Sequence, residues 1–339
     1  MTADRQTVLI TGGAGYVGSV LVPRMLAQGY RVKVLDLYLF GPDVLRAVKN
    51  HPRLEQIKGD IRDQALLGAS LKGCDSVIHL ACISNDPSFE LNPAVSRAIN
   101  FDAFAPLVKI SKASGVRRFI YASTSSVYGV SERENVTEDH PLLPITDYNK
   151  YKGLCEPILL AEQSPGFTTV IIRPATVCGY SPRQRLDLTV NILTNTAVNA
   201  GRISVFGGEQ MRPNIHIDDM VDLYLMLLEL PPERIAGGTY NAGYENFRVR
   251  DLAEKVRTVV EQECPERKPL DIVTTPSDDK RSYHISSEKI RRELGFAPRR
   301  TIEDAVQDLV KAFRAGKLPN ALTDDRYYNI KTMRTLELV

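Results

Sequence analysis

The chain has 339 residues, 43% of them hydrophobic and 25% charged, and its 43 basic and 41 acidic side chains leave a formal net charge of +2. This composition is typical of a folded globular protein, and it excludes collagen-like, low-complexity and disordered chains. A charge so close to zero argues against a nucleic-acid polymer as partner. The length fits two domains or one large α/β unit.

The cysteines and the hydropathy pattern bear on location. Five dispersed cysteines form no CxxC pair, which favours a reducing cytoplasm over a disulfide framework and predicts no metal site. The sequence has no run of 18 apolar residues, and its first residues lack the pattern of a signal peptide. We therefore expect a cytoplasmic protein that does not enter a membrane.

The first half of the chain alternates apolar strands with amphipathic helices. The predicted strands are Thr7–Thr11, Arg31–Asp36, Leu54–Lys58, Ser76–Ala81, Arg118–Ser123 and Thr168–Arg173. The predicted helices are Tyr16–Gln28, Asp43–Val48, Asp63–Leu71, Pro93–Ser114 and Asn149–Glu162. This alternation predicts an α/β fold with a doubly wound parallel sheet, which binds ligands at the carboxyl ends of its strands.

The second half loses this alternation. Its predicted helices are Leu188–Val198, Asp218–Leu230, Arg250–Val260 and Ile302–Phe313, and its predicted strands are Ile203–Val205 and Ile215–Ile217. We assign residues 1–175 to a first domain, to which 213–236 return, and residues 176–212 and 237–320 to a smaller, interleaved α/β domain. Residues 321–339 form an irregular tail of unknown role.

A glycine-rich loop follows the first predicted strand. Gly12, Gly15 and Gly18 have the spacing GxxGxxG, between an apolar strand and a helix. Glycines at these positions allow a tight turn, a close approach of a pyrophosphate and close helix packing. A simple turn has the same glycines, but the strand–loop–helix context favours a dinucleotide site of the Rossmann type. Asp36 ends the second strand, and no arginine follows it directly. A carboxylate at this position binds the ribose hydroxyls and repels a 2′-phosphate, so the sequence favours NAD over NADP.

Two further segments carry candidate catalytic groups. Tyr148 and Lys152 lie four residues apart on a predicted helix, so both face the same side, and a neighbouring ammonium lowers the pKa of a phenol. The spacing is weak by itself, because Tyr327 and Lys331 repeat it in the tail. The hydroxyl-rich segment 121–129 ends the fifth predicted strand, at the carboxyl edge of the sheet.

Taken together, these motifs resemble an extended short-chain dehydrogenase/reductase of the NAD-dependent nucleotide-sugar epimerase/dehydratase family, closest to UDP-glucose/UDP-galactose 4-epimerase-like enzymes. The resemblance spans residues 7–313. Besides the glycine loop, the hydroxyl segment and the Tyr/Lys pair, it rests on Gly59–Asp63, His79–Ala81, Asn100, Arg173-Pro174, Arg212 and His216–Asp219.

The resemblance implies a role for each matching residue. The catalytic residues it implies are Thr124, Tyr148 and Lys152. The residues it implies for NAD, held tightly, are Gly12, Gly15, Tyr16, Val17, Gly18, Asp36, Asp60, Ile61, Leu80, Ala81, Asn100, Tyr148 and Lys152. The residues it implies for a nucleotide-diphosphate sugar are Thr124, Ser125, Thr176, Arg212 and Arg281. His79 and Cys178 are interpreted as packed side chains, with a substrate-side acid/base role as the alternative for Cys178. Arg183 and Arg185 are interpreted as solvated, with a contribution to diphosphate binding as the alternative.

Within the family, Ser125 and Ser126 stand where 4,6-dehydratases carry an Asp-Glu pair, and Ser126 stands where 3,5-epimerases place a cysteine. This favours a 4-epimerase, which needs only Thr124, Tyr148 and Lys152. Thr176 departs from the asparagine common in epimerases. A dehydratase or another 4-keto-forming oxidoreductase stays an alternative, as does a non-catalytic NAD-binding regulator.

The predicted helices also bear on assembly. The apolar residues on two of them predict a homodimer through a four-helix interface, as is frequent in the family. These residues are Ala103, Phe104, Leu107, Val108, Ile110, Leu154, Ile158 and Leu159.

Overall fold

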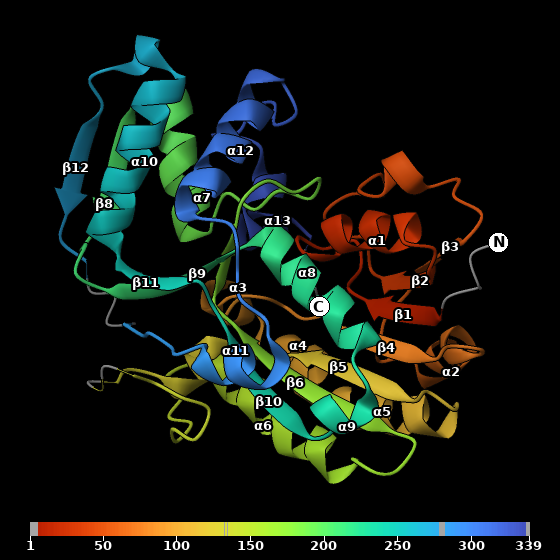
Figure 1. Cartoon of the computed structure of the whole chain (residues 1–339). Coiled ribbons are helices and arrows are strands. Elements are labelled where there is room, and N and C mark those ends of the chain that lie inside the picture. Colours follow the sequence, from red (N-terminus) through yellow and green to blue (C-terminus); the bar gives the residue numbers. More distant parts are fainter. Residues whose placement is uncertain (1–5, 132, 134, 278–281, 337–339) are drawn as a thin grey trace.

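A seven-stranded parallel sheet forms the centre of the computed structural model, which describes residues 6–131, 133, 135–277 and 282–336 (Figure 1). The strand order is β10-β6-β5-β4-β1-β2-β3, and all six neighbouring pairs are parallel. The strands are β1 (Thr7–Thr11), β2 (Arg31–Asp36), β3 (Leu54–Lys58), β4 (Ser76–His79), β5 (Arg118–Ala122), β6 (Thr168–Pro174) and β10 (Gly238–Ala242). The predicted Rossmann-type doubly wound fold is confirmed. The direction of winding reverses between β1 and β4, so a ligand crevice is expected at their carboxyl ends.

Strand β10 was missed by the sequence analysis. Residues 238–242 were assigned to the smaller domain, but they pair with β6 at the edge of the main sheet. The segment Gly-Thr-Tyr-Asn-Ala has no apolar run of its own, and its place in the sheet comes from the hydrogen bonds to β6.

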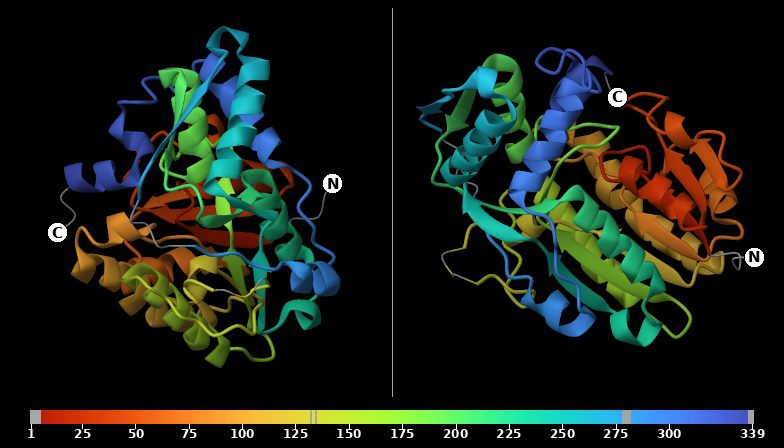
Figure 2. Two further views of the ribbon diagram at one scale, coloured as in Figure 1. Left: turned by 90° about the vertical axis from the view of Figure 1, so that its left-hand side faces the viewer. Right: turned by 45° about the horizontal axis from the view of Figure 1, so that its top comes forward.

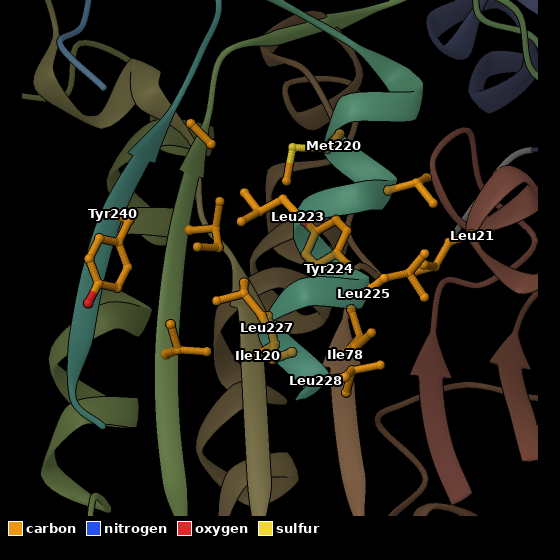
Figure 3. Packing of buried hydrophobic residues seen from close by; sticks show 14 of the residues in the cluster. Leu21, Ile78, Ile120, Met220, Leu223, Tyr224, Leu225, Leu227, Leu228 and Tyr240 are labelled. Atoms are coloured by element: carbon orange, nitrogen blue, oxygen red, sulfur yellow. The ribbon is translucent and has the colours of Figure 1, made fainter. Parts of the chain in front are cut away.

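Helices cover both faces of this sheet because successive side chains of each strand point to opposite sides. Helices α1 (Gly18–Ala27) and α8 (Ile217–Glu229) pack on one face, where Leu21, Met220 and Tyr224 belong to one buried cluster with Ile78 and Ile120 (Figure 3). The opposite face is covered by α2 (Gln64–Leu71), α5 (Phe104–Ala113) and α6 (Asp147–Ala161). Each buried leucine in these layers contributes roughly 2 kcal/mol.

Two of the predicted helices differ from the observed structure. The segment 93–114 is interrupted: α4 (Pro93–Arg97) and α5 are joined by a wider, π-helical stretch, Ala98–Asp102. The segment 43–48 forms only a 3₁₀ turn at Arg46–Val48, none of whose residues is buried, so no packing stabilises a longer helix there. A short helix, α3 (Asp86–Phe89), precedes α4.

The rest of the second half packs around its own core above the carboxyl edge of the sheet (Figure 1). Its strands form a three-stranded sheet of β7 (Thr176–Cys178), β9 (Met211–His216) and β11 (Glu245–Arg248), and a parallel pair of β8 (Arg202–Phe206) and β12 (Asp271–Thr275). Its helices are α7 (Thr189–Asn195), α10 (Val249–Glu263) and α12 (Ile302–Arg314). The short helices α9 (Pro232–Ile235) and α11 (Glu288–Leu294) pack instead on the main sheet, beside β6 and β10.

The tail, expected to be irregular, contains helix α13 (Asn329–Thr335). This helix contacts α3, so the end of the chain returns to the segment that follows β4 (Figure 2). Among the residues that the structure describes, no helix is long and apolar enough to cross a bilayer.

Candidate active site

A cavity of about 480 Å³ lies at the carboxyl ends of the strands, where both halves of the chain meet. Its walls come from the segments that follow β1, β2, β4 and β5, from helices α6 and α8, and from the segment 183–189. This is the place that the winding of the sheet predicts for a ligand.

The glycine loop is packed too closely for side chains. Gly12 has φ +75°, and a Cβ there would lie 2.6 Å from the Ala81 nitrogen. A Cβ at Gly18 would lie 2.5 Å from the Gly13 carbonyl oxygen. The loop backbone therefore faces the cavity directly at the start of α1, where helix N–H groups favour an anion.

Asp36 is held at the end of β2. Its two carboxylate oxygens accept the Ala14 and Tyr38 N–H groups at 2.9 and 2.8 Å. Burial raises the pKa of Asp36 above its ordinary value, and these hydrogen bonds act in the opposite direction. The carboxylate stays oriented toward its own loop and lines the cavity, as a ribose-binding group requires.

Most of the residues expected to bind NAD line this cavity. They are Gly12, Gly15, Tyr16, Val17, Gly18, Asp36, Asp60, Ile61, Leu80, Ala81, Tyr148 and Lys152. Asn100 is not among the lining residues. Its buried amide accepts the Ile83 N–H at 2.8 Å and donates to the Ile83 carbonyl at 3.0 Å, and it thereby fixes the loop after β4.

The three predicted catalytic side chains face the same cavity. Thr124 follows β5, and Tyr148 and Lys152 stand one turn apart on α6. Thr124 Oγ1 lies 2.8 Å from Ser126 Oγ, which donates a hydrogen bond to Asn149 Oδ1. This chain of polar groups connects the hydroxyl of Thr124 to the helix that carries Tyr148.

The electrostatics of Tyr148 differ from the prediction that Lys152 lowers its pKa. Burial raises the pKa of Tyr148 well above its ordinary value, and the nearby Cys82 and Asp86 raise it further. Among the groups that act on it, Arg185 is the cation that lowers it. The Lys152 ammonium instead donates to the Ala122 carbonyl and lies 4.5 Å from the centre of the Tyr121 ring.

A buried ion pair anchors α6 to the sheet. Glu156, on α6, lies 2.5 Å from Arg173 Nη2 at the end of β6, and the two side chains are only 5% and 7% exposed. Ser123 Oγ donates to the same carboxylate at 2.6 Å. The ends of β5 and β6 and the catalytic helix are therefore fixed to one another.

The predicted substrate residues fall into three groups. Thr124, Thr176 and Arg212 line the cavity, and Arg212 lies 5.4 Å from the centre of the Tyr283 ring. Ser125 is buried and does not line it, whereas the neighbouring Ser126 does. Arg281 lies outside the described residues.

Two side chains interpreted as packed are buried in the structure. His79 is 2% exposed and stacks on Tyr121, and burial lowers its pKa to about 3, so it is neutral. Cys178 is fully buried, its Sγ contacts the Ile215 carbonyl, and burial raises its pKa. Both side chains are therefore packing groups.

Four charged or amide residues of the cavity wall were not among the predicted site residues and lie close together at the segment 183–187 and the tail. Arg183 and Arg185, interpreted as solvated, both line the cavity, together with Asp187 and Asn329 of the tail. Arg183 is 4% exposed, and Arg185 Nε lies 2.9 Å from Asp187 Oδ1. The closely spaced charges between positions 183 and 187 were the one signal in the sequence, and such a run is usually solvated.

One group with metal-ligating side chains lies apart from the cavity lining. Ligand atoms of His216, Asp218 and Asp308 lie within 4.8 Å of one another, and His216 Nδ1 accepts the Asp218 N–H at 3.1 Å. This hydrogen bond caps the start of α8, which gives His216 a structural role.

Comparison with known proteins gives consistent matches. Residues 8–243 match the model of the "NAD dependent epimerase/dehydratase family". A dTDP-glucose 4,6-dehydratase from Streptomyces griseus is 30% identical over 308 residues, 88% of this chain and 91% of that protein. A UDP-glucose 4-epimerase from Lactobacillus helveticus is 26% identical over 321 residues, 88% and 94% of the two chains. The crystal structure of DesIV, a dTDP-glucose 4,6-dehydratase from Streptomyces venezuelae with NAD and TYD bound, superposes with a TM-score of 0.80 at 26% identity and covers 92% and 98% of the two chains.

Proposed function

Because the chain belongs to the NAD dependent epimerase/dehydratase family, we propose that it is an NAD-dependent nucleotide-sugar epimerase acting at C4. The substrate is transiently oxidised to a 4-keto sugar and then reduced on the opposite face. One observation carries the choice of reaction: Ser125 and Ser126, and no carboxyl pair, follow Thr124.

The residues of the cavity fit the dinucleotide. Gly12 and Gly18 leave no room for a Cβ, so the loop backbone is open to a pyrophosphate, and Asp36 lies at the end of β2 for the ribose. When bound, NAD supplies the hydride acceptor and, in its reduced form, the hydride donor. The reaction regenerates the oxidised cofactor, so we propose that NAD remains tightly bound between turnovers.

The chain itself supplies proton transfer and orientation. In its phenolate form, which the neighbouring Arg185 favours, Tyr148 accepts the proton of the C4 hydroxyl as general base and later returns it to the same oxygen. Thr124, held by Ser126, hydrogen-bonds that oxygen. Arg212 binds the diphosphate, because a guanidinium matches the geometry of phosphate oxygens, and its ring contact with Tyr283 orients it.

A 4,6-dehydratase is the second candidate. It is favoured by the 30% identity to the Streptomyces griseus dehydratase. In this reaction the 4-keto sugar also loses water across C5 and C6, which requires an acid/base pair near the substrate. Asp86 and Cys82 line the cavity, and both act on the pKa of Tyr148; they are the groups to test if water is lost.

Product analysis separates these reactions. The purified chain is incubated with UDP-, GDP-, CDP-, ADP- and dTDP-sugars, and the products are examined by mass spectrometry and NMR. We expect an unchanged mass and an inverted C4 centre; loss of water would instead establish the dehydratase. Tyr148→Phe should lower turnover by orders of magnitude, while Tyr244→Phe removes a hydroxyl outside the cavity lining and serves as the matched control. A chain that binds NAD but converts none of these sugars would favour the non-catalytic regulator.

We also propose a homodimer through α5 and α6. Leu154 is 42% exposed on α6, and Ile110 and Ile158 are partly exposed. The other predicted residues, Ala103, Phe104, Leu107, Val108 and Leu159, are buried within the subunit, so the interface depends on fewer side chains than expected. Light scattering of the wild type and of Leu154→Glu tests it; a wild type of monomeric mass would contradict it.

The cysteines support the expected cytoplasmic location. All five are unpaired in the structure, and four of them are buried. Free thiols persist in a reducing compartment, so we propose that the protein works in the cytoplasm.

A further inference from the structure

The segment after β7 is fastened to the first turn of α1, beside the glycine loop. Tyr16 donates its hydroxyl to the Gly179 carbonyl at 2.7 Å, and Ser181 donates to the Tyr16 carbonyl at 2.7 Å. The Arg183 N–H donates to Ser19 Oγ at 3.2 Å. The backbone of Arg183 is thus fixed next to the helix terminus at which a pyrophosphate is expected.

The side chain of Arg183 is buried in the cavity wall with spare donors. It is 4% exposed, and its guanidinium carbon lies 3.5 Å from the centre of the Phe40 ring. Nη2 donates to Asn329 Oδ1 at 2.5 Å, but Nε and Nη1, both buried, have no hydrogen-bond partner. Unsatisfied buried donors on a cation are unfavourable, so this arrangement calls for an anion that reaches it from the cavity.

The neighbouring charged side chains do not supply hydrogen-bond acceptors for these two donors of Arg183. Burial lowers the pKa of Arg183, and the neighbouring Arg185 lowers it further; Asp187 and Asp36 act in the opposite direction. Asp187, however, is paired with Arg185, and Asp36 accepts two backbone N–H groups. Both carboxylates are therefore engaged elsewhere.

We propose that Arg183 binds the pyrophosphate of the dinucleotide through Nε and Nη1, and that Asn329 of the C-terminal tail holds the guanidinium in place for it. This inference rests on the proposed use of NAD. Arginine suits the task because it stays charged and donates several hydrogen bonds to phosphate oxygens. The cofactor site then includes a residue from the substrate half of the chain, in addition to the glycine loop.

The tail is well anchored for this role. Asn329 is 3% exposed, its N–H donates to Asp187 Oδ2 at 3.1 Å, and its Nδ2 donates to Ser84 Oγ at 2.8 Å. The Leu186 N–H donates to the Tyr327 carbonyl at 2.8 Å. Asn329 thereby connects the loop after β4 to the segment that carries Arg183, and it acts as a positioning residue.

The test compares ligands that differ in their phosphates. Dissociation constants of NAD+, NADP+, ADP and adenosine are measured by calorimetry on the full chain after bound nucleotide has been removed. Arg183→Met should raise the constants for NAD+ and ADP by about tenfold or more, and leave that for adenosine within about twofold. Arg183→Lys, which keeps the charge, should retain part of the affinity and covers the case in which the methionine variant does not fold.

Two further variants complete the design. Arg326→Met makes the same change at an exposed arginine of the tail, whose side chain is 66% exposed, and should leave all four constants unchanged. Asn329→Ala should raise the NAD+ constant by about threefold, less than the loss of Arg183 itself. An unchanged NAD+ constant in Asn329→Ala would overturn the role of the tail.

The remaining outcomes separate this inference from the proposed function. Unchanged constants for NAD+ and ADP in both Arg183 variants would overturn the inference, as would a loss confined to NADP+, which would assign Arg183 to a 2′-phosphate. Neither result affects the epimerase proposal. A wild-type chain that binds no NAD+ would overturn both, whereas one that binds NAD+ with the expected dependence on Arg183 but epimerises no sugar would overturn only the proposed function.

Discussion

Replacing Glu156 with glutamine removes one charge from the buried ion pair that joins α6 to the sheet. The glutamine keeps the size of the side chain and one carbonyl oxygen, but the guanidinium of Arg173 loses its counter-charge. Arg173 Nη2 and Nε lie 2.5 and 3.0 Å from the two carboxylate oxygens, and Ser123 Oγ lies 2.6 Å from one of them. With both partners less than one-tenth exposed, water does not replace the lost charge.

The size of the effect follows from this burial. Removing one partner of a buried ion pair leaves an uncompensated charge and lowers the free energy of unfolding by about 3–5 kcal/mol. For 339 residues, the unfolding entropy is about 0.7 kcal/mol/K. We therefore expect the Tm of Glu156→Gln to fall by about 4–7 °C.

The assay is thermal unfolding followed by circular dichroism, with Glu162→Gln as control. Glu162 caps the end of the same helix and pairs with Lys112 at 2.9 Å, but its side chain is 27% exposed. Removing its charge should therefore lower the free energy of unfolding by less than about 1 kcal/mol and shift Tm by about 1 °C. Equal shifts in the two variants, or a Tm for Glu156→Gln within 1 °C of the wild type, would refute the argument that burial sets the cost.

Three further predictions concern the cavity. Tyr148→Phe should lower kcat by about 10²- to 10⁴-fold while NAD+ remains bound, because the phenol transfers the proton and the glycine loop and Asp36 still hold the cofactor; steady-state kinetics and calorimetry check this, and full activity would contradict it. Asp36→Ser should lower the ratio of the NADP+ to the NAD+ dissociation constant by about tenfold or more, because it removes the carboxylate that repels a 2′-phosphate; an unchanged ratio would exclude that role. Burial raises the pKa of Asp187, but Arg185, Arg183 and the Asn329 N–H together outweigh this and hold the pKa below its ordinary value. The pair therefore stabilises the fold above about pH 4 and loses this effect as the pH falls through the lowered pKa. In urea unfolding from pH 6 to pH 3, the difference in free energy of unfolding between wild type and Asp187→Asn should shrink below about pH 4, and a constant difference would count against the pair.

The main sheet could be predicted because its central strands β1, β4, β5 and β6 are apolar runs buried on both faces. Six of the seven strands begin at the predicted residue, including the edge strand β3, none of whose residues is buried. The seventh, β10, has no apolar run of its own. The glycine loop, Thr124 and the Tyr148/Lys152 pair were equally accessible, because fixed spacings at strand and helix ends place them at the carboxyl edge of the sheet.

The remaining site residues depend on contacts between distant parts of the chain. Arg183 and Asn329 are 146 positions apart, and neither lies in a motif of fixed spacing. A charged residue in a loop is normally solvated, so composition predicts exposure for Arg183 and Arg185. Their burial results from the hydrogen bonds that fasten the segment to α1 and from the helix at the end of the tail.

This arrangement bears on how the two halves cooperate. Residue 175 is the predicted limit of the first domain, but the cavity is lined from both sides of it, and Arg183 in the second half bonds to Ser19 in the first turn of α1. Any movement of the second half toward or away from the sheet must therefore act on the hydrogen bonds between Ser181, Arg183 and the first turn of α1. If Arg183 binds the pyrophosphate, the bound cofactor joins the two halves. NAD should then protect the segment 179–188 and the tail from hydrogen exchange together, although they are far apart in the sequence.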